Sequence, residues 1–260
     1  MELHSFIICA YKQSPYLEEC IESIMKQELQ SYVAVATSTP CDFIYDIAKK
    51  YNLEVFVRDG KSDIKDDWNF AANCAKTRWV TIAHQDDVYE SDYSKAVCAK
   101  IEKNSNAILA ITDYHCLING VKSANKNSRI RRFLRTPLRI KKLAGKKWVK
   151  RMILSMGNSI CCPTVAYNRD LIKGDIFTSD MKFNIDWDTF LKFAESDGSF
   201  AYVDKPLVNY RVHDGATTKE CMESNLRIEE DTKMFNKFWP KWITGIIMYF
   251  YKGAYEEYDQ

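Results

Sequence analysis

The sequence predicts an α/β protein built on a doubly wound, mostly parallel β-sheet. Short apolar runs alternate with amphipathic stretches of about ten residues through the first half of the chain. Strands that alternate with helices form parallel sheets with helices on both faces, because the crossover between parallel strands is right-handed. The 260 residues are 46% hydrophobic and 28% charged, which is typical of a globular protein with a sizeable core.

Apolar runs of five or six residues, bounded by polar or turn-forming residues, are the expected strands of the first half. They cover residues 5–10, 32–36, 53–57, 79–83 and 107–112. The segments between them carry apolar side chains at helical spacing and are the expected helices. These helices cover residues 15–25, 42–51, 66–76 and 91–103, and Ser14 with Pro15 marks the start of the first.

The second half is less regular and begins with a polybasic stretch over residues 122–150. We expect helices at residues 146–156, 186–196 and 225–238, strands or extended segments at 160–167, 200–203 and 206–212, and a final Trp- and Tyr-rich tail. No repeat or low-complexity linker separates these parts. The expected organisation is one domain over residues 1–215, with parts 1–115 and 116–215, and a helical, aromatic extension over residues 216–260.

Charge is distributed unevenly along the chain. From Tyr114 through Arg169 there is no Asp or Glu, whereas 14 of the 37 Lys and Arg lie there. The rest of the chain therefore has 23 basic and 35 acidic residues. A basic segment within an acidic body predicts an anionic partner on one face.

The cysteines and the termini bear on location. The chain has nine cysteines, an odd number, and no C-x-x-C motif, which favours free thiols in a reducing compartment. The first residues have neither a basic region nor a long apolar run, so we expect no signal peptide. The apolar stretch from Trp242 to Tyr251 is shorter than the roughly 20 residues that span a bilayer. We therefore expect a cytoplasmic protein.

Polar side chains follow the expected strands at the edge where their carboxyl ends meet. The run 79–83 ends in His84, Gln85, Asp86 and Asp87. Adjacent carboxylates repel one another unless a cation or a donor-rich ligand joins them, and hard divalent cations bind carboxylate and phosphate oxygens together. The sequence therefore predicts a metal–diphosphate site here. The alternative is a solvated turn or helix cap.

Five motifs match those of a known family, in the family's order, over about residues 4–215. The motifs are Phe6–Lys12 with Tyr16–Ile24, Trp68–Ala71, His84–Asp87, Ile185–Asp188 and Tyr210–His213. On these residues the chain resembles the inverting GT-A-fold glycosyltransferases of family 2, bacterial enzymes that move a sugar from a nucleotide diphosphate sugar. The resemblance implies a GT-A, Rossmann-like sheet, whose nucleotide-sugar-binding part is 1–115 and whose acceptor-side part is 116–215.

One loop and two single residues depart from the family pattern. Residues 37–40, Thr-Ser-Thr-Pro, replace an acidic Asp-Gly-Ser loop that grips the base and ribose. His84 replaces the first Asp of the metal motif, and Ile185 replaces the Glu before the base.

The resemblance also implies roles for individual residues. Asp186 is the catalytic base, and Asp87 and His213 are ligands of Mn²⁺ or Mg²⁺. The residues expected to bind the nucleotide sugar are Ala10, Tyr11, Thr37, Ser38, Trp68, Asn69, Asp86 and Arg211. For Asp186 the alternative is a helix cap with Asp188 in the first turn. For His213, Arg211 and Trp68 the alternative is a structural role.

The function that follows is metal-dependent, inverting transfer of a sugar, by default from a UDP-sugar, to a hydroxyl of a glycan or lipid-linked acceptor. The pathway expected from the family is synthesis of a bacterial surface polysaccharide or glycoprotein glycan. One rival is a sugar nucleotidyltransferase, which would carry a Gly-rich basic loop where this chain has residues 10–14. The other rival is a non-catalytic scaffold that uses the basic segment.

The basic segment has three interpretations. It contacts a lipid diphosphate or the anionic inner face of the membrane, it binds nucleic acid, or it is a solvated face. We expect no nucleic acid. Arg131, Arg132, Arg135, Arg139 and Lys142 recur at helical spacing, which is compatible with an interfacial helix and a peripheral membrane location. The Trp- and Tyr-rich tail offers a second membrane contact or a homodimer patch.

Overall fold

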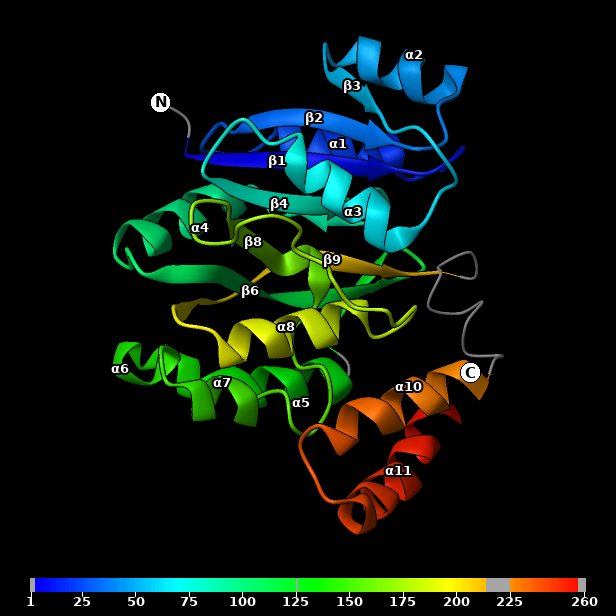
Figure 1. Cartoon of the computed structure of the whole chain (residues 1–260). Helices are drawn as coiled ribbons and strands as arrows, with labels where there is room; N and C mark the ends of the chain where they lie inside the picture. Colours follow the sequence, from blue (N-terminus) through cyan, green and yellow to red (C-terminus); the bar gives the residue numbers. More distant parts are fainter. Residues whose placement is uncertain (1–2, 125, 214–224, 257–260) are drawn as a thin grey trace.

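The computed structural model describes residues 3–124, 126–213 and 225–256. Within them the strands form a nine-stranded sheet in the order β3-β2-β1-β4-β8-β6-β9-β5, and β7 pairs with β6. The strands are β1 His4–Ala10, β2 Tyr32–Thr37, β3 Glu54–Val57, β4 Trp79–His84, β5 Val88–Tyr89, β6 Ala107–Ile118, β7 Val121–Ser123, β8 Val165–Asn168 and β9 Ser199–Val212. Figure 1 shows these strands stacked as one twisted layer with helices on both sides.

Helices account for most of the remaining described chain. They are α1 Leu17–Met25, α2 Asp42–Lys50, α3 Ile64–Asn73, α4 Tyr93–Glu102, α5 Lys126–Arg135, α6 Lys141–Ala144, α7 Lys147–Met152, α8 Ile185–Glu195, α10 Asn225–Asn236 and α11 Lys241–Glu256. Two 3₁₀ turns, Thr136–Arg139 and Cys162–Thr164, interrupt the second half. No helix in the described ranges is long and apolar enough to cross a membrane.

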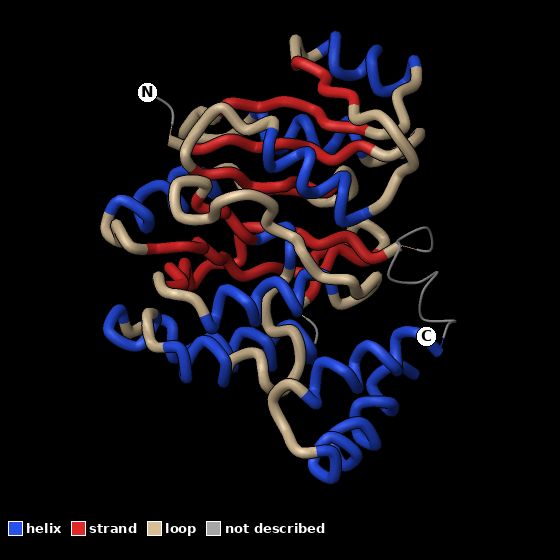
Figure 2. Tube along the Cα trace, viewed as in Figure 1, coloured by secondary structure: helices blue, strands red, loops and turns tan. Residues whose placement is uncertain are grey.

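The predicted mostly parallel sheet is confirmed. Strands β1, β2, β3 and β4 run parallel, and β6 runs parallel to β9. The short strands β5, β7 and β8 are antiparallel to their neighbours. The tube in Figure 2 shows this alternation of strand and helix in the first half of the chain.

Three expectations for the second half were wrong in extent. Residues 160–167 are a strand only from Val165, because Pro163 lacks the N–H that a sheet needs and lies in the preceding 3₁₀ turn. The segments 200–203 and 206–212 form one strand, β9, which pairs with a β6 that continues to Ile118. The interfacial helix expected along the basic segment is broken after α5 by the 3₁₀ turn that contains Pro137.

The core lies on both faces of the sheet, because successive residues of a strand point to opposite sides. Phe6 and Ile8 of β1 pack with α1, α2 and α4, whereas Ile7 packs with α3, α7 and α8. Helices α10 and α11 add Phe235 and Met248 to the core on the Ile7 face of the sheet. The division into domains at residue 215 remains a prediction.

The fold places polar loops at one edge of the sheet. Strands β1, β2, β3, β4 and β9 all end there, as the arrowheads in Figure 1 show. Helix α8 is joined to the start of β9 by a short connection and begins on the side where β9 ends. Asp186 therefore lies on the same side as the strand exits.

Candidate active site at the strand exits

Gln85 joins the exits of β1 and β4. Its Oε1 accepts a hydrogen bond from the Tyr11 amide at 2.8 Å, and its Nε2 donates to the Tyr11 carbonyl at 3.2 Å. Ala10 is buried, whereas the Tyr11 side chain is nearly half exposed. The predicted residue Tyr11 is therefore held beside Asp86 with its ring available to a planar ligand. The sequence reasoning did not single out Gln85.

The loop at residues 37–40 is fastened by hydroxyl groups. Thr37 Oγ1 accepts a hydrogen bond from the Thr39 amide at 3.0 Å, and Thr39 Oγ1 accepts one from the Lys12 amide at 2.7 Å. Ser38 Oγ donates to Asp67 Oδ2 at 2.9 Å. The predicted residues Thr37 and Ser38 thus lie at the edge, with Thr37 buried as a support for the loop.

Asp67 is the carboxylate that contacts this loop. It lies in the first turn of α3, where Oδ1 accepts from Arg58 Nε at 2.8 Å and Oδ2 accepts from Ser62 Oγ at 2.7 Å. With Ser38, these contacts tie the exits of β2 and β3 to α3. The sequence signal for Asp67 is weak, because an acidic residue in the first turn of a helix is favoured by the helix dipole alone.

Trp68 and Asn69 follow Asp67 but point to different surroundings. The Trp68 ring stacks on His84, with ring centroids 5.0 Å apart and an interplanar angle of 17°. Asn69 donates from Nδ2 to the Phe177 carbonyl at 2.8 Å and accepts from the Phe177 amide at 2.9 Å. Both ends of the buried Asn69 amide are therefore used by the fold. Its contact with the donor remains a prediction.

The two adjacent carboxylates differ sharply in environment. Asp87 is buried, and its Oδ1 accepts from the Arg211 amide at 2.9 Å. Its Oδ2 has no hydrogen-bond partner among the described residues. Burial and the neighbouring Asp86 raise the pKa of Asp87 well above its usual range. Asp86 is partly exposed, and its Oδ2 lies 3.0 Å from His213 Nε2.

The structure therefore brings His213 to Asp86 and not to Asp87. Burial opposes ionisation of Asp86, but the hydrogen bond from His213 and the nearby His84 lower its pKa overall. No group of three or more His, Cys, Asp or Glu in the described ranges could hold a metal ion. A carboxylate oxygen and an imidazole nitrogen, both partly exposed, nevertheless fit a divalent cation that takes its other ligands from water and diphosphate.

Arg211 is occupied by protein contacts. Its Nε donates to the Asp86 carbonyl at 2.8 Å, and its guanidinium pairs with Glu19 at 2.5 Å and lies 4.3 Å from the centroid of the Tyr16 ring. The side chain is almost fully buried. Arg211 therefore anchors the end of β9 to α1 and to the Asp86–Asp87 turn. Its contact with the nucleotide sugar remains a prediction.

Asp186 lies in the first turn of α8. Its Oδ1 accepts a hydrogen bond from the Trp187 amide at 2.7 Å, and its Oδ2 accepts one from Asn158 Nδ2 at 2.7 Å. Burial raises the pKa of Asp186 to about 6, although these two donors and the Arg131 cation favour the charged form. The sequence reasoning missed Asn158, because nothing in its local pattern points to α8.

The helix-cap alternative does not describe Asp186. The residue that precedes α8 is Asn184, whose side chain makes no capping hydrogen bond. Asp186 is already within the helix, and its bond to Trp187 fixes the carboxylate without closing a cap. Asp188 pairs with Lys237. Asp186 is therefore the carboxylate at this end of α8 whose environment suits proton transfer near neutral pH.

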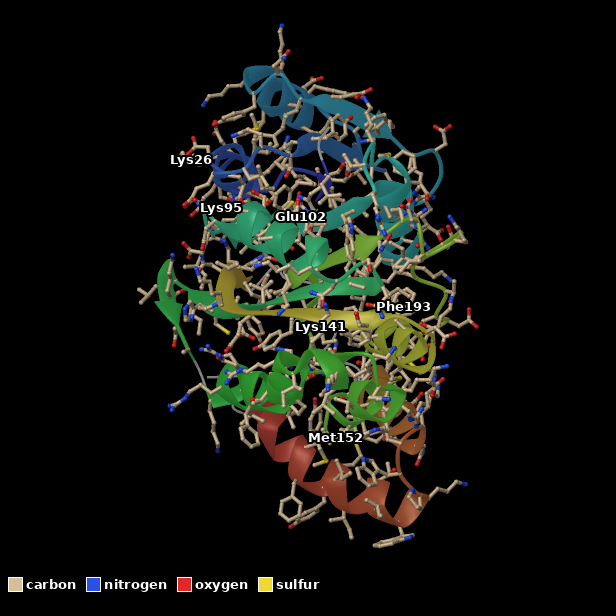
Figure 3. All side chains as sticks on the ribbon, turned by 90° about the vertical axis from the view of Figure 1, so that its left-hand side faces the viewer. Lys26, Lys95, Glu102, Lys141, Met152 and Phe193 are labelled. Atoms are coloured by element: carbon tan, nitrogen blue, oxygen red, sulfur yellow. The ribbon has the colours of Figure 1, made fainter. Side chains whose placement is uncertain are left out.

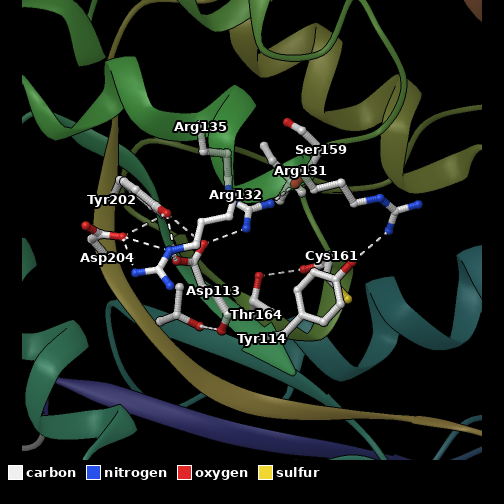
Figure 4. Close-up of polar contacts among 12 residues, drawn as sticks. Asp113, Tyr114, Arg131, Arg132, Arg135, Ser159, Cys161, Thr164, Tyr202 and Asp204 are labelled. Atoms are coloured by element: carbon white, nitrogen blue, oxygen red, sulfur yellow. Dashed lines mark hydrogen bonds and ion pairs between the residues drawn. The ribbon is translucent and has the colours of Figure 1, made fainter. Parts of the chain in front are cut away.

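Part of the basic segment is paired with acidic residues from outside it. Asp113 of β6 forms ion pairs with Arg135 at 2.5 Å and Arg132 at 3.0 Å, and it accepts a hydrogen bond from Tyr202 at 2.7 Å. Asp204 of β9 pairs with Arg132 at 3.0 Å. Figure 4 shows this cluster between α5 and the two strands. Arg132 and Arg135 therefore have acidic partners from outside the segment that fold against it. The anionic partner expected for the basic segment remains a prediction.

Arg135 links this cluster to the candidate base. Its guanidinium is buried and donates to the Ser159 carbonyl as well as to Asp113. Ser159 directly follows Asn158, which holds Asp186. Arg131 of the same helix donates to Tyr114 at 3.1 Å, as Figure 4 shows.

Comparison with known proteins supports the same fold and assigns a family. The family model described as "Glycosyl transferase family 2" matches residues 5–158, which is more than half of the chain. A search of curated proteins finds no match.

Solved structures share the fold at low sequence identity. S. aureus TarS 1–349 has a TM-score of 0.58 and 16% identity, over 95% of this chain and 69% of that chain. The same protein in complex with UDP-GlcNAc has a TM-score of 0.59 and 16% identity, over 95% and 70%. The mannosyltransferase PcManGT from Pyrobaculum calidifontis, in complex with GDP-Man and Mn²⁺, has a TM-score of 0.63 and 16% identity, over 90% and 63%.

The chain spans 42% of a longer TarS chain. The family match covers β1, the strand exits of the first half, the Asp86–Asp87 turn and the loop that carries Asn158. The chain belongs to glycosyl transferase family 2, and it is a glycosyltransferase with the GT-A fold.

Proposed function

We propose that the protein is a metal-dependent, inverting glycosyltransferase that moves a sugar from a nucleotide diphosphate sugar to an acceptor hydroxyl. The observation that carries this proposal is Asp186, held by Asn158 and the Trp187 amide, with its pKa raised to about 6 on the side of the strand exits. A carboxylate with this pKa is mostly ionised above pH 7. It is then ready to accept the proton of an acceptor hydroxyl.

The donor site of the proposal is the edge formed by Tyr11, Ser38, Trp68 and Asp86. Tyr11 offers an exposed ring to the nucleotide base, and the loop that carries Ser38 is held against Asp67. UDP is the default nucleotide on family grounds. Among proteins of this fold, TarS has been solved with UDP-GlcNAc and PcManGT with GDP-Man and Mn²⁺.

We assign Asp86 and His213 as the residues that would hold Mn²⁺ or Mg²⁺, because their side chains lie 3.0 Å apart and are partly exposed. A divalent cation there supplies positive charge to the leaving diphosphate. Asp87, expected as the metal ligand, is buried and bonded to the Arg211 amide. Its proposed role is to hold the end of β9, and with it His213, against the turn.

The acceptor, pathway and location complete the proposal. The acceptor is a hydroxyl of a glycan or lipid-linked molecule in synthesis of a bacterial surface polysaccharide or glycoprotein glycan. The location is the cytoplasm, at the inner face of the membrane. A sugar nucleotidyltransferase is no longer favoured, since the family match is to glycosyl transferases. The scaffold alternative predicts no dependence on Asp186.

Thermal unfolding with a panel of nucleoside diphosphates, with Mn²⁺ or with EDTA, tests the donor site. A ligand at 100 times its dissociation constant stabilises a protein by about 2.7 kcal/mol. We expect one nucleotide to stabilise the protein only with Mn²⁺, and His213→Ala to remove that dependence. His115→Ala is the matched control, because His115 is a partly exposed histidine of β6 that is not one of the two proposed metal ligands. A metal-dependent shift that survives in His213→Ala would contradict the assignment.

A further inference from the structure

The entry to α8 is held by a carboxylate from a helix that is distant in sequence. Glu230 of α10 is only 3% exposed. The Lys182 amide donates to its Oε1 at 2.8 Å. The Phe183 and Asn184 amides donate to its Oε2 at 2.8 and 3.1 Å. Three successive backbone N–H groups just before α8 are therefore satisfied by one buried side chain of α10.

Helix α10 also holds the residues on both sides of Asp186. Asn184, which precedes α8, makes no capping hydrogen bond with its side chain. Its Nδ2 donates instead to Asp231 Oδ1 of α10 at 2.8 Å. The Trp187 ring packs edge-to-face on Phe235 of α10, with ring centroids 5.1 Å apart. The position of the turn that carries Asp186 is thus set by α10.

The far end of α8 is held by Lys150 of α7. The buried Lys150 Nζ donates to the carbonyls of Phe193, Ser196 and Gly198 at 3.1, 2.8 and 2.8 Å, which uses all three donors of an ammonium group. Figures 1 and 3 both show α8 (yellow) beside α7 (green) on the side away from the sheet, and Figure 3 labels Phe193. A carboxylate at the start of α8 and a cation at its end both complement the helix dipole, and together they fix the helix along its axis.

We propose that Glu230 is a positioning residue for the catalytic base. It holds the entry to α8 and thereby sets where the Asp186 carboxylate lies relative to Asn158 and the acceptor hydroxyl. The inference rests on the proposed function, in which Asp186 removes the acceptor proton. Without the Glu230 carboxylate three N–H groups lose their acceptor, so the segment before α8 must shift to find other partners. A shift of about 1 Å in a reacting group can cost about 10²-fold in rate.

Positioning differs from a purely structural role in what it changes. Lost stability lowers the melting temperature and leaves the turnover of the folded protein unchanged. Misplacement of Asp186 lowers kcat in the folded protein. It leaves donor affinity unchanged, because the proposed donor site is formed by other elements of the fold.

Amide hydrogen exchange of the full chain tests the placement without donor or acceptor. The Trp187 amide donates to Asp186 Oδ1 at 2.7 Å, so its protection reports whether the carboxylate is in place. We expect this amide to exchange about tenfold faster or more in Glu230→Ala. Glu229→Ala is the matched control, because Glu229 is the exposed neighbour of Glu230 on α10. Equal protection of the Trp187 amide in the wild type and Glu230→Ala would overturn the proposal.

A second measurement compares kcat, from release of nucleoside diphosphate, with the donor dissociation constant from calorimetry. We expect Glu230→Ala to lower kcat about tenfold or more and to keep the dissociation constant within about threefold. Glu230→Gln keeps the length of the side chain and one accepting oxygen, so its kcat should lie between those of Glu230→Ala and the wild type. It also replaces Glu230→Ala in both measurements if that variant does not unfold cooperatively in urea.

Val97→Ala is the control for lost stability, because Val97 of α4 is buried on the opposite face of the sheet from α8. An unchanged kcat in Glu230→Ala, or an equal fall in Val97→Ala, would overturn the proposal. If Asp186→Asn kept the rate of transfer while Glu230→Ala still exposed the Trp187 amide, the proposed function alone would fail. The placement of the turn by Glu230 would then stand.

Discussion

Replacement of Asp186 by Asn should stabilise the protein while it removes sugar transfer. The folded structure raises the pKa of Asp186 from 3.8 to about 6, because burial disfavours the charged carboxylate. A group with a raised pKa contributes stability that is present below its unfolded pKa and is lost as the pH rises through its folded pKa. The loss here falls between about pH 4 and pH 6, and one pKa unit corresponds to about 1.36 kcal/mol.

The magnitude follows from that shift of about two units. The charged Asp186 costs the folded state at most about 3 kcal/mol above pH 7. The true value is smaller, because the carboxylate retains some contact with solvent. Asp186→Asn carries no charge, so it should unfold at higher urea concentration than the wild type at pH 8, and the difference should vanish near pH 4.

Urea unfolding of both proteins at pH 4, 6 and 8 measures this difference, and nucleoside diphosphate release measures transfer. We expect the variant to lose about 10²- to 10⁴-fold in rate, the usual contribution of a positioned base. Asp188→Asn is the control, because Asp188 is paired with Lys237 and its replacement should not stabilise the protein. A variant that is equally stable at pH 8, or that still transfers sugar, would refute the reasoning.

Three further predictions follow from contacts of the site. Asn158→Ala removes from Asp186 a charge-assisted hydrogen bond of about 1.5–3 kcal/mol. The pKa read from the acidic limb of a plot of kcat/KM against pH should therefore rise by about one unit or more. An unchanged pKa would show that Asn158 does not act on the base. Arg135→Met leaves the buried Asp113 with fewer partners and should lower the free energy of unfolding, measured in urea, by about 3–5 kcal/mol. An unchanged free energy of unfolding would show that the Arg135–Asp113 pair is dispensable. Gln85→Ala removes the two hydrogen bonds that hold the Tyr11 backbone. Nucleotide affinity measured by calorimetry should fall about tenfold, about the effect of one hydrogen bond, with little change in melting temperature. Unchanged affinity would exclude a role for Gln85 in the donor site.

The first half of the fold could be predicted because its signals are local. Apolar runs and helical spacing placed β1 to β4 and α1 to α4 within a few residues of their bounds. The shift of α3 to an earlier start, at Ile64, comes from Asp63, whose side chain accepts from the Lys65 amide at 3.0 Å. The convergence of the strand exits followed from the parallel topology alone.

The rest depended on contacts between distant residues. Asp113 and Asp204 flank the basic segment in sequence on opposite sides, and their pairing with Arg132 appears only when β6 and β9 are aligned. The pairing of His213 with Asp86 requires β9 to pair with β5, the short strand that follows the Asp86–Asp87 turn, and no local pattern indicates this pairing. Asn158 was missed for the same reason.

The site consists of a donor part, at the Asp86–Asp87 turn and the end of β9, and a separate catalytic base, Asp186. In the proposed donor site Asp86 and His213 would hold the metal ion, whereas Asp87 and Arg211 are buried and hold the end of β9 against the Asp86–Asp87 turn. Asp186 belongs to a different helix and is held by its own partners. Binding of the donor and removal of the acceptor proton are therefore expected to be separable by mutation.

The most direct test measures both steps in one pair of proteins. Both the wild type and Asp186→Asn receive the nucleotide sugar that stabilises the wild type in the presence of Mn²⁺. Calorimetry measures its dissociation constant in each protein. A second assay measures the rate at which each protein releases nucleoside diphosphate in the presence of an acceptor extract. We predict the same dissociation constant within about threefold and a release rate at least 100-fold lower in the variant, in line with the loss of a positioned base. Equal release rates in the two proteins would contradict the assignment of Asp186 as the base.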